Sequence, residues 1–508
     1  MFFVKKQRSG WVWVLALLVM IAGCAPPSSG SSANQELVYA STADAVGLSP
    51  IMTNDSASSR VIDQIYETLF VRDPKTLKIK PKLAKSYENP DPNTWIIHLR
   101  KGIQFHDGTP FDAKAVEYTF DKLRDPDTGA PRASLLASVK EVEVKDADTV
   151  VLKTDKPYGP MLAALTHTNA AIVSPSADKE QDLMKKPIGT GPFQLEKWVQ
   201  GDRLTLVPNP DYWGDKPMLK KVTFRVVPEI STAISLLERG EVHLVDGLQP
   251  EHLDRLKNHD KIKLSKQKGT PITYLGFNMK KAPMKDHAFR QAIAYAIDEE
   301  AIIGAMNGLA YPSEGVIGPK VFGYDDSIEG KGYKHDPDRA KELAGQADID
   351  QTVTITTANT GNYPMLAELI QGQLSKAGIK AKIKTLEWGA YLDTTRKGDF
   401  ELMVGGWSNS TADGSELVYP NLHSDNVGSS NSTQTAIPEA DELIIKSRTT
   451  TDENERLKAL NEVNQLLVER APWIPLYHEV VVTAMTENVQ GLQVDPTGRW
   501  ELAGVTLK

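Results

Sequence analysis

Residues 352–404 read TVTITTANTGNYPMLAELIQGQLSKAGIKAKIKTLEWGAYLDTTRKGDFELMV, and this stretch decides the fold class. Short β-type runs at 353–355, 379–383 and 400–404 alternate with two helical segments. The first helix is expected to begin near Pro364 and to end at Gly378, because Pro suits the first helical turn and Gly the position after the last. This strand–helix–strand repetition predicts a parallel sheet with right-handed crossovers, and therefore an α/β protein.

The rest of the chain shows the same alternation of short strands and amphipathic helices. Helices are predicted where apolar side chains recur every three or four residues, and Asp112 is placed to cap one of them. A hairpin is predicted where two β-type runs flank Lys145-Asp146-Ala147-Asp148. The predicted strands cover 37–41, 95–99, 139–144, 149–152, 223–227 and 242–245, and the predicted helices cover 58–69, 113–123, 231–237 and 289–297.

Polar residues gather in loops that follow predicted strands. Ligands of open α/β sheets bind outside the carboxyl ends of the strands, so the loops after Thr357 and Val404 are candidate binding loops. Asn362 and Tyr363 lie before the helix at Pro364, whose free N–H groups suit a ligand carboxylate. The other candidates, each also compatible with an ordinary loop or capping role, are Asp44, Asn54, Asn169 and Asn278.

The first residues have the pattern of a secretory leader. Three positive residues precede an apolar run at 11–22, which as a helix would span roughly 18 Å, less than the roughly 30 Å of a bilayer core. The run ends in Ile21-Ala22-Gly23-Cys24, which resembles the bacterial lipoprotein cleavage box. We predict that residues 1–23 are a lipoprotein signal peptide, that Cys24 is lipidated, and that 24–35 form a flexible tether. The alternative is an ordinary cleaved signal with a chance cysteine.

Length and charge limit the kind of protein further. A chain of 508 residues exceeds what one hydrophobic core usually supports, so two or three domains are expected. The net charge is −8 and no basic block interrupts the sequence, which argues against a nucleic-acid partner. Apolar runs after the leader are too short or too interrupted to span a membrane, so the lipid anchor is the only membrane contact we expect.

The usual catalytic and metal-binding motifs are absent. The sequence lacks a Gly-x-Ser-x-Gly elbow, a phosphate-binding loop ending in Gly-Lys-Ser/Thr, and a His-Glu-x-x-His motif. The ten histidines are scattered, and the only cysteine is assigned to the lipid. We therefore expect no catalytic residues, no metal site and no cofactor, although a catalytic triad can assemble in space without a sequence motif.

Several segments carry a resemblance to a known family. They include TWIIHLRKGIQFHDG at 94–108, FDAKAV at 111–116, GTGPF at 189–193, NPDYW at 209–213, YLGFN at 274–278, FRQAI at 289–293 and APWIPL at 471–476. Together they resemble the extracellular solute-binding proteins of family 5, which serve ABC importers of peptides, nickel and glutathione. The segments occur in the family's order and cover nearly the whole chain after the leader.

The resemblance implies a two-lobed periplasmic-binding-protein fold of class II with an extra domain inserted in the first lobe. The lobes would close on the ligand about a hinge where the chain crosses between them. The implied boundaries are 36–62, 187–270 and 476–508 for lobe I, 63–186 for the inserted domain, and 271–475 for lobe II.

The loop after Gly406-Trp407 is the specificity element in this family. Dipeptide and oligopeptide binders carry an aspartate three residues after that tryptophan, where it pairs with the ligand's α-ammonium. Ser410 occupies that place here, so the usual salt bridge is missing and the loop is similar to that of the glutathione-binding branch. The resemblance implies ligand contacts from Trp407, Ser408, Asn409, Ser410, Thr411 and Asp413. A solvated turn is the alternative, because Asn, Ser and Asp favour turns.

The function implied is that of a monomeric, lipid-anchored, extracytoplasmic binding protein of an ABC importer. It would capture a short peptide or a glutathione-like molecule and deliver it to the transmembrane permease subunits. A nickel, metallophore or haem carrier of the same family is an alternative, although the binding loops lack a His or Cys cluster. An extracellular hydrolase and a signal-peptide receptor are further alternatives.

Overall fold

The parallel unit expected at 352–404 is present in the computed structural model, which describes residues 35–346 and 351–508. Its elements in chain order are β14 (Val353–Ala358), α10 (Tyr363–Lys376), β15 (Ala381–Leu386), α11 (Trp388–Arg396) and β16 (Leu402–Trp407). β14 pairs in parallel with both β15 and β16. α10 ends where expected, because Gly378 adopts a left-handed φ of 79° that other residues resist.

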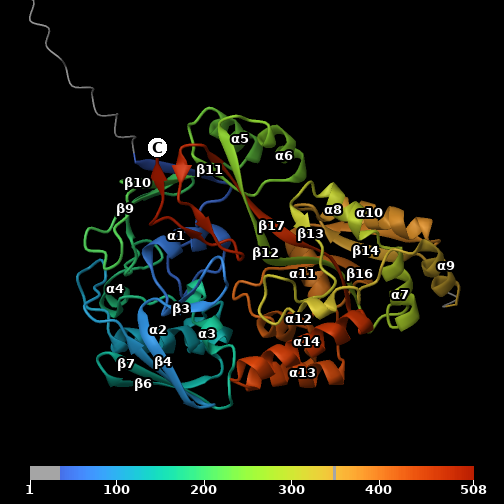
Figure 1. Ribbon diagram of the computed structural model, residues 1–508, viewed down its shortest axis with the longest axis horizontal. Helices are drawn as coiled ribbons and strands as arrows, with labels where there is room; N and C mark the ends of the chain where they lie inside the picture. Colours follow the sequence, from blue (N-terminus) through green and yellow to red (C-terminus); the bar gives the residue numbers. More distant parts are fainter. Residues whose placement is uncertain (1–34, 347–350) are drawn as a thin grey trace, which may run out of the picture. The chain divides into compact units, whose positions relative to one another are not determined.

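Within the described residues, this unit forms one end of an eleven-stranded mixed sheet (Figure 1). β12 (Ile262–Phe277) runs antiparallel to β16, and β17 (Trp473–Thr486) runs antiparallel to β12. The strands beyond β17 are, in sheet order, β11 (Leu244–Val245), β1 (Glu36–Ser41), β10 (Lys221–Val226), β9 (Arg203–Pro208) and β8 (Phe193–Val199), and β13 (Ala310–Tyr311) pairs with β17.

The two long strands β12 and β17 connect the two ends of this sheet. Residues 262–268 of β12 pair with 480–486 of β17, next to β11, whereas residues 272–276 pair with 473–478, next to β16. The register shifts between Lys268 and Ile272 and again between Thr273 and Tyr274, and such irregularities bend a strand. The lobe boundaries expected after 270 and 475 fall inside β12 and β17, and they stay a prediction.

A separate four-stranded antiparallel sheet lies in the segment expected to be the inserted domain. Its order is β4 (Ala84–Asp91), β5 (Thr94–Leu99), β7 (Thr149–Thr154) and β6 (Val139–Asp146), so the expected hairpin is confirmed. α2 (Ala113–Arg124) packs against β6. Asp112 caps this helix as expected, because its Oδ1 accepts from the backbone N–H groups of Lys114 and Ala115 at 3.0 and 3.1 Å.

Two predicted elements differ from the structure. The helix expected at 58–69 is α1 (Ser56–Ile65): it begins earlier because the Asp55 carboxylate accepts from Ser58 N–H at 2.8 Å, and it ends earlier because Tyr66 is extended. The strand expected at 242–245 is only the two-residue β11. Both errors lie at element ends, where local patterns specify structure least.

The remaining helices lie in the connections between strands and pack around the sheets (Figure 1). They are α3 (Met161–Ala164), α4 (Pro175–Glu180), α5 (Ile230–Glu238), α6 (Pro250–Lys257), α7 (His287–Ala296), α8 (Glu299–Ala305), α9 (Pro337–Gln346), α12 (Ser415–Leu422), α13 (Pro438–Thr449) and α14 (Glu453–Arg470). Short two- and three-residue strand pairs complete the fold: β2 (Phe70–Arg72) with β3 (Ile79–Pro81), β18 (Val489–Gln490) with β21 (Thr506–Leu507), and β19 (Gln493–Val494) with β20 (Trp500–Glu501).

Candidate functional site

Two of the expected binding loops meet at one edge of the large sheet. β14 and β16 are parallel neighbours, so the loops that follow them start at the same edge. The contact is close at Gly406, where an added Cβ would lie 2.8 Å from the Tyr363 hydroxyl oxygen. A side chain at position 406 would displace the Tyr363 side chain. This close approach explains why a glycine suits position 406.

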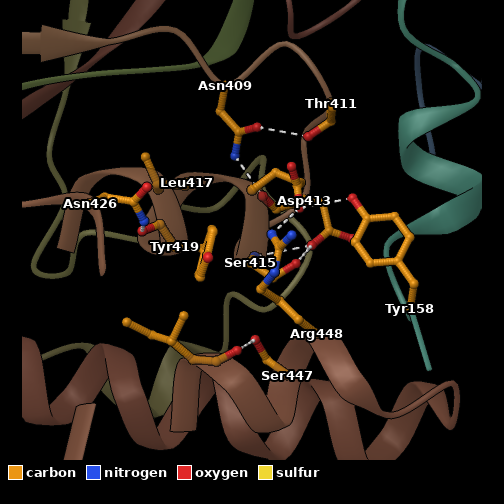
Figure 2. Close-up of polar contacts among 12 residues, drawn as sticks. Tyr158, Asn409, Thr411, Asp413, Ser415, Leu417, Tyr419, Asn426, Ser447 and Arg448 are labelled. Carbon is orange, nitrogen blue, oxygen red and sulfur yellow. Dashed lines mark hydrogen bonds and ion pairs between the residues drawn. The ribbon is translucent and has the colours of Figure 1, made fainter. Parts of the chain in front are cut away.

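The loop 408–414 between β16 and α12 holds its own shape through side-chain hydrogen bonds (Figure 2). The Asn409 amide donates to the Asp413 carbonyl at 3.0 Å, and its Oδ1 accepts from the Thr411 hydroxyl at 3.2 Å. The Asn409 carbonyl accepts from the Thr270 hydroxyl of β12 at 2.8 Å. Asn409 and Thr411 are buried, so their side chains shape the loop more than they face solvent.

Asp413 does not present its carboxylate to solvent. The side chain is buried and is paired with Arg456 of α14, at 2.8 and 2.9 Å from Arg456 Nη2 to the two carboxylate oxygens. The Ser415 hydroxyl donates to the same carboxylate at 2.7 Å. The Asp413 carboxylate, which the sequence suggested as a ligand contact, is therefore neutralised by Arg456 within the protein. We leave Asp413 out of the proposed ligand-binding residues.

A cavity of about 640 Å³ lies beside this loop. One wall comes from the 407–411 stretch and from α12 and α13, and the opposite wall comes from three segments of the expected inserted domain, 132–138, 155–158 and His167. Trp407, Ser408, Asn409, Ser410 and Thr411 all line it, so the structure brings together five of the six residues expected in the specificity loop.

Charged side chains from both walls also line this cavity. They are Arg132, Asp155, Lys156, Glu416, Asp425 and Arg448. Arg448 and Glu416 form an ion pair, and the Arg448 guanidinium stacks 4.1 Å from the centre of the Tyr419 ring. Both partners of this pair are therefore largely engaged before a ligand arrives.

Contacts cross between the two walls at several points. The Tyr158 hydroxyl donates to the Glu416 carboxylate at 3.2 Å, and Gly159 N–H donates to the Arg448 carbonyl at 2.8 Å. His167 Nε2 lies 2.9 Å from the Ser410 hydroxyl oxygen. These contacts join segments far apart in sequence on opposite sides of the cavity.

The family comparison agrees with this architecture. The family described as bacterial extracellular solute-binding proteins, family 5 Middle, matches residues 78–429, well over half of the chain. The chain belongs to this family. The fold class expected from the sequence, a two-lobed α/β binding-protein fold, is thereby confirmed.

Individual members of the family are similar over nearly their full length. Glutathione-binding protein GsiB of Salmonella paratyphi A is 29% identical, over 98% of this chain and 98% of that protein. Heme-binding protein A of Haemophilus influenzae is 29% identical, over 97% and 98%. The solved structure of the ABC transporter-associated periplasmic binding protein DppA of Helicobacter pylori in complex with peptide STSA is 30% identical, with a TM-score of 0.79, over 93% of this chain and 98% of that chain.

Membership in family 5 makes the chain a solute-binding protein and not an enzyme. In the part of the chain that the structure describes, no group of three His, Cys, Asp or Glu side chains could hold a metal ion. The helices described there include none with the length and apolar character needed to span a bilayer. Cys24, the expected lipidation site, lies outside the described residues.

Four residues expected in other loops of this family 5 protein make structural contacts. Asp44 accepts from Trp198 Nε1 at 3.1 Å and from Gly201 N–H at 2.7 Å. Buried Asn169 donates to the carbonyls of Pro50 and Thr53, and buried Asn278 to those of Gly398 and Phe400. Asn54 is exposed and does not line the cavity, and its Oδ1 accepts from Arg132 Nε at 2.9 Å.

Asn362 and Tyr363 lie with a second group of residues beside Gly406. Tyr363, Trp388 and Tyr391 form an aromatic cluster, in which the last two rings stack with centres 5.6 Å apart. Glu479 of β17 is solvent-exposed near Tyr363. Its charge in turn helps to raise the pKa of Tyr363 to about 12, although burial is the larger cause.

Sequence reasoning missed the far wall of the cavity. Arg132, Lys156, Tyr158 and His167 come from segments with no motif, and Glu416 and Arg448 lie on ordinary amphipathic helices. No signal in a single sequence could have found them, because their proximity to the 408–414 loop exists only in the folded chain.

Proposed function

We propose that this family 5 protein captures a short peptide or a glutathione-like molecule and delivers it to the permease subunits of an ABC importer. The observation that carries the proposal is the cavity between the 407–411 stretch and the inserted domain. Its volume of about 640 Å³ lies within the roughly 300–1,000 Å³ of small-molecule sites. Trp407 supplies an aromatic wall, and the hydroxyls of Ser408 and Ser410 can hydrogen-bond amide groups.

The named relatives support a peptide-class ligand. One is a glutathione-binding protein, and a solved relative holds the peptide STSA. Both are similar to this chain over more than nine-tenths of its length.

Calorimetric titration tests the proposal directly. The purified protein is first unfolded and refolded to remove any bound molecule, whose mass is recorded. It is then titrated with glutathione and with the alanine peptides of two to five residues. We expect saturable one-to-one binding of at least one probe. Absence of binding to every probe, together with a non-peptide mass in the released fraction, would refute the proposal.

A haem or metal-chelate carrier is the second candidate function. It is favoured by the similarity to heme-binding protein A over nearly the full length of both chains. The absorbance spectrum and the metal content of the purified protein discriminate between the two. A haem absorption band with stoichiometric iron, or stoichiometric nickel, would replace the peptide as cargo.

The membrane anchor is part of the same proposal. We place the lipid on Cys24, after removal of 1–23, so that the binding protein stays beside its permease as a monomer. Two acyl chains hold a protein stably at a bilayer, whereas one chain does so only marginally. The variant Cys24→Ser should move the protein from the membrane fraction to the soluble fraction. Retention in the membrane fraction would contradict lipidation at this position.

The lobe boundaries complete the proposal. We take 36–62, 187–270 and 476–508 as lobe I, 63–186 as its insert and 271–475 as lobe II, with the hinge at the register shifts of β12 and β17. Ligand should then reduce the radius of gyration measured by X-ray scattering, as expected for hinge closure. An unchanged radius at saturating ligand would argue against closure.

A further inference from the structure

His167 and Ser410 form a hydrogen-bonded pair in the lining of the cavity. The backbone N–H of Asn169 donates to His167 Nδ1 at 3.2 Å, so Nδ1 is an acceptor and carries no proton. The proton of the neutral ring is therefore on Nε2, which donates to the Ser410 hydroxyl oxygen at 2.9 Å. The geometry thus fixes both the tautomer and the direction of this hydrogen bond.

The Ser410 hydroxyl consequently retains its own proton for a ligand. Its oxygen accepts from His167, and in the described chain no protein acceptor receives its O–H. Burial, helped by the positive charges of Arg132 and Arg499, lowers the pKa of His167 to about 3, so the ring stays neutral at physiological pH. At this end of the cavity the loop therefore offers a hydrogen-bond donor and no carboxylate.

Arg132 adds a positive charge on the opposite wall. Its Nε donates to Asn54 at 2.9 Å, and no carboxylate of the described residues lies within 4.0 Å of its guanidinium. A guanidinium stays charged in proteins and has five N–H donors, so four of them remain available here. Arg132 and Ser410 line the same cavity, and His167, the hydrogen-bond partner of Ser410, lines it too. One ligand group can therefore meet both, and we call Arg132 and Ser410 together the subsite.

The acidic side chains of the cavity do not cancel this charge. Glu416, the carboxylate whose charge reaches Arg132, is paired with Arg448 and accepts from Tyr158. The Asp425 side chain is 68% exposed, and Asp155 is exposed beside exposed Lys156. Solvent screens such exposed charges. Among the described residues, neither carboxylate hydrogen-bonds Ser410 or pairs with Arg132.

We infer that this subsite takes a carboxylate of the ligand, held by the Ser410 hydroxyl and the Arg132 guanidinium, and gives no binding energy to an α-ammonium. The inference rests on the proposed function and specifies its ligand class as peptides recognised through an acidic group, with the amino terminus free or blocked. A charge-assisted hydrogen bond is stronger than a neutral one, so the carboxylate dominates recognition at this end.

The test compares three forms of whichever probe binds most tightly among glutathione and the alanine peptides. We expect N-acetylation to change the dissociation constant by about threefold at most, and C-terminal amidation to raise it by about tenfold or more. In Arg132→Gln the effect of amidation should fall to about threefold or less, whereas the exposed control Arg239→Gln should keep the full effect. Melting temperatures verify that each variant is folded.

The outcomes separate this inference from the proposed function. If a probe binds but acetylation weakens it tenfold and amidation does not, the carboxylate subsite is refuted while the peptide function stands. If amidation weakens binding equally in Arg132→Gln and wild type, the role of Arg132 is refuted. If no probe binds in any form, both the inference and the proposed function fail. Ser410→Asp should reverse the preference, making acetylation the costly change.

Discussion

Arg456 Nη2 lies 2.8 and 2.9 Å from the two carboxylate oxygens of Asp413, and both side chains are buried. Burial disfavours the charged carboxylate, but the Arg456 charge and the Ser415 hydroxyl outweigh it and hold the pKa of Asp413 below its usual value. The Arg456 guanidinium also lies 4.8 Å from the centre of the Phe322 ring. This ion pair joins the 408–414 loop to α14, beside the residues of the loop that line the cavity.

Breaking this pair should cost stability. In Asp413→Asn the buried Arg456 charge loses its counterion, so the free energy of unfolding should fall by about 3–5 kcal/mol. Urea denaturation measures the change. Asp393→Asn is a matched control, because it removes an exposed (i,i+4) pair with Lys397 and should cost about 0.5 kcal/mol or less. Unchanged stability of Asp413→Asn with a large loss of ligand affinity would instead make Asp413 a ligand-binding group.

The fold was predictable where its determinants are local. The parallel unit β14–α10–β15–α11–β16 follows from alternating patterns, from Pro364 and from Gly378, all within one stretch of chain. The antiparallel pairing of β12 with β17 was not predictable from patterns, because these strands are separated by roughly two hundred residues and their register depends on the assembled sheet. The family resemblance led us to expect that the chain crosses between lobes near residues 270 and 475. The structure shows that β12 and β17 pair there with shifts in register.

The site was predictable on one side only. Trp407 and Ser410 were found because the family places its specificity loop after Gly406. The role of Asp413 could not be read from the sequence, because its partner Arg456 lies on another helix. Asn169 and Asn278 illustrate the same limit: a polar residue in a loop can bind ligand or satisfy buried carbonyls, and only the folded neighbours decide.

The Trp407 side chain should contribute most of the apolar contact with ligand. We expect Trp407→Ala to weaken affinity by roughly 2–3 kcal/mol, as for a buried aromatic anchor. Trp388→Ala is the matched control, because Trp388 is 43% exposed in the aromatic cluster with Tyr363 and does not line the cavity. A large effect of Trp388→Ala with none from Trp407→Ala would move the ligand to the aromatic cluster of Tyr363, Trp388 and Tyr391.

Glu299 should make stability depend on pH. Burial, with the charges of Glu314 and Glu300, raises the pKa of Glu299 from 4.5 to about 7. Between these two values the folded protein holds a proton that the unfolded chain has lost, so stability falls as pH rises through this range. The contribution is fully present below about pH 4.5 and is lost above about pH 7.

Replacing this carboxyl with an amide removes the dependence. Glu299→Gln retains the oxygen that accepts from Ser313 N–H. The variant should be more stable than wild type by roughly 1–3 kcal/mol at pH 8 and equal to it at pH 4. Urea denaturation across this range measures the difference, with exposed Glu442→Gln as the control that should show no change. A gain of equal size at both pH values would exclude titration of Glu299 as its cause.

The Tyr158 hydroxyl should stabilise the ligand-bound arrangement of the cavity walls. Because it donates across the cavity to Glu416 at 3.2 Å, Tyr158→Phe removes one contact between the walls while retaining the ring that packs on Arg448. We expect ligand affinity to fall about fivefold, the equivalent of about 1 kcal/mol for one hydrogen bond. Dissociation should account for most of this loss, because contacts that hold a closed state act on the rate of opening.

Tyr118→Phe provides the control for this contact. Its hydroxyl donates to Asp178 at 2.6 Å, and neither residue lines the cavity. Tyr118→Phe should lower the free energy of unfolding without lowering ligand affinity. Tyr158→Phe should lower ligand affinity without lowering the free energy of unfolding. Stopped-flow measurement of dissociation in both variants separates the two effects. Equal dissociation rates in Tyr158→Phe and wild type would mean that the two walls stay together without the Tyr158–Glu416 bond. The contacts of Arg448 and of the ligand itself would then hold the walls together.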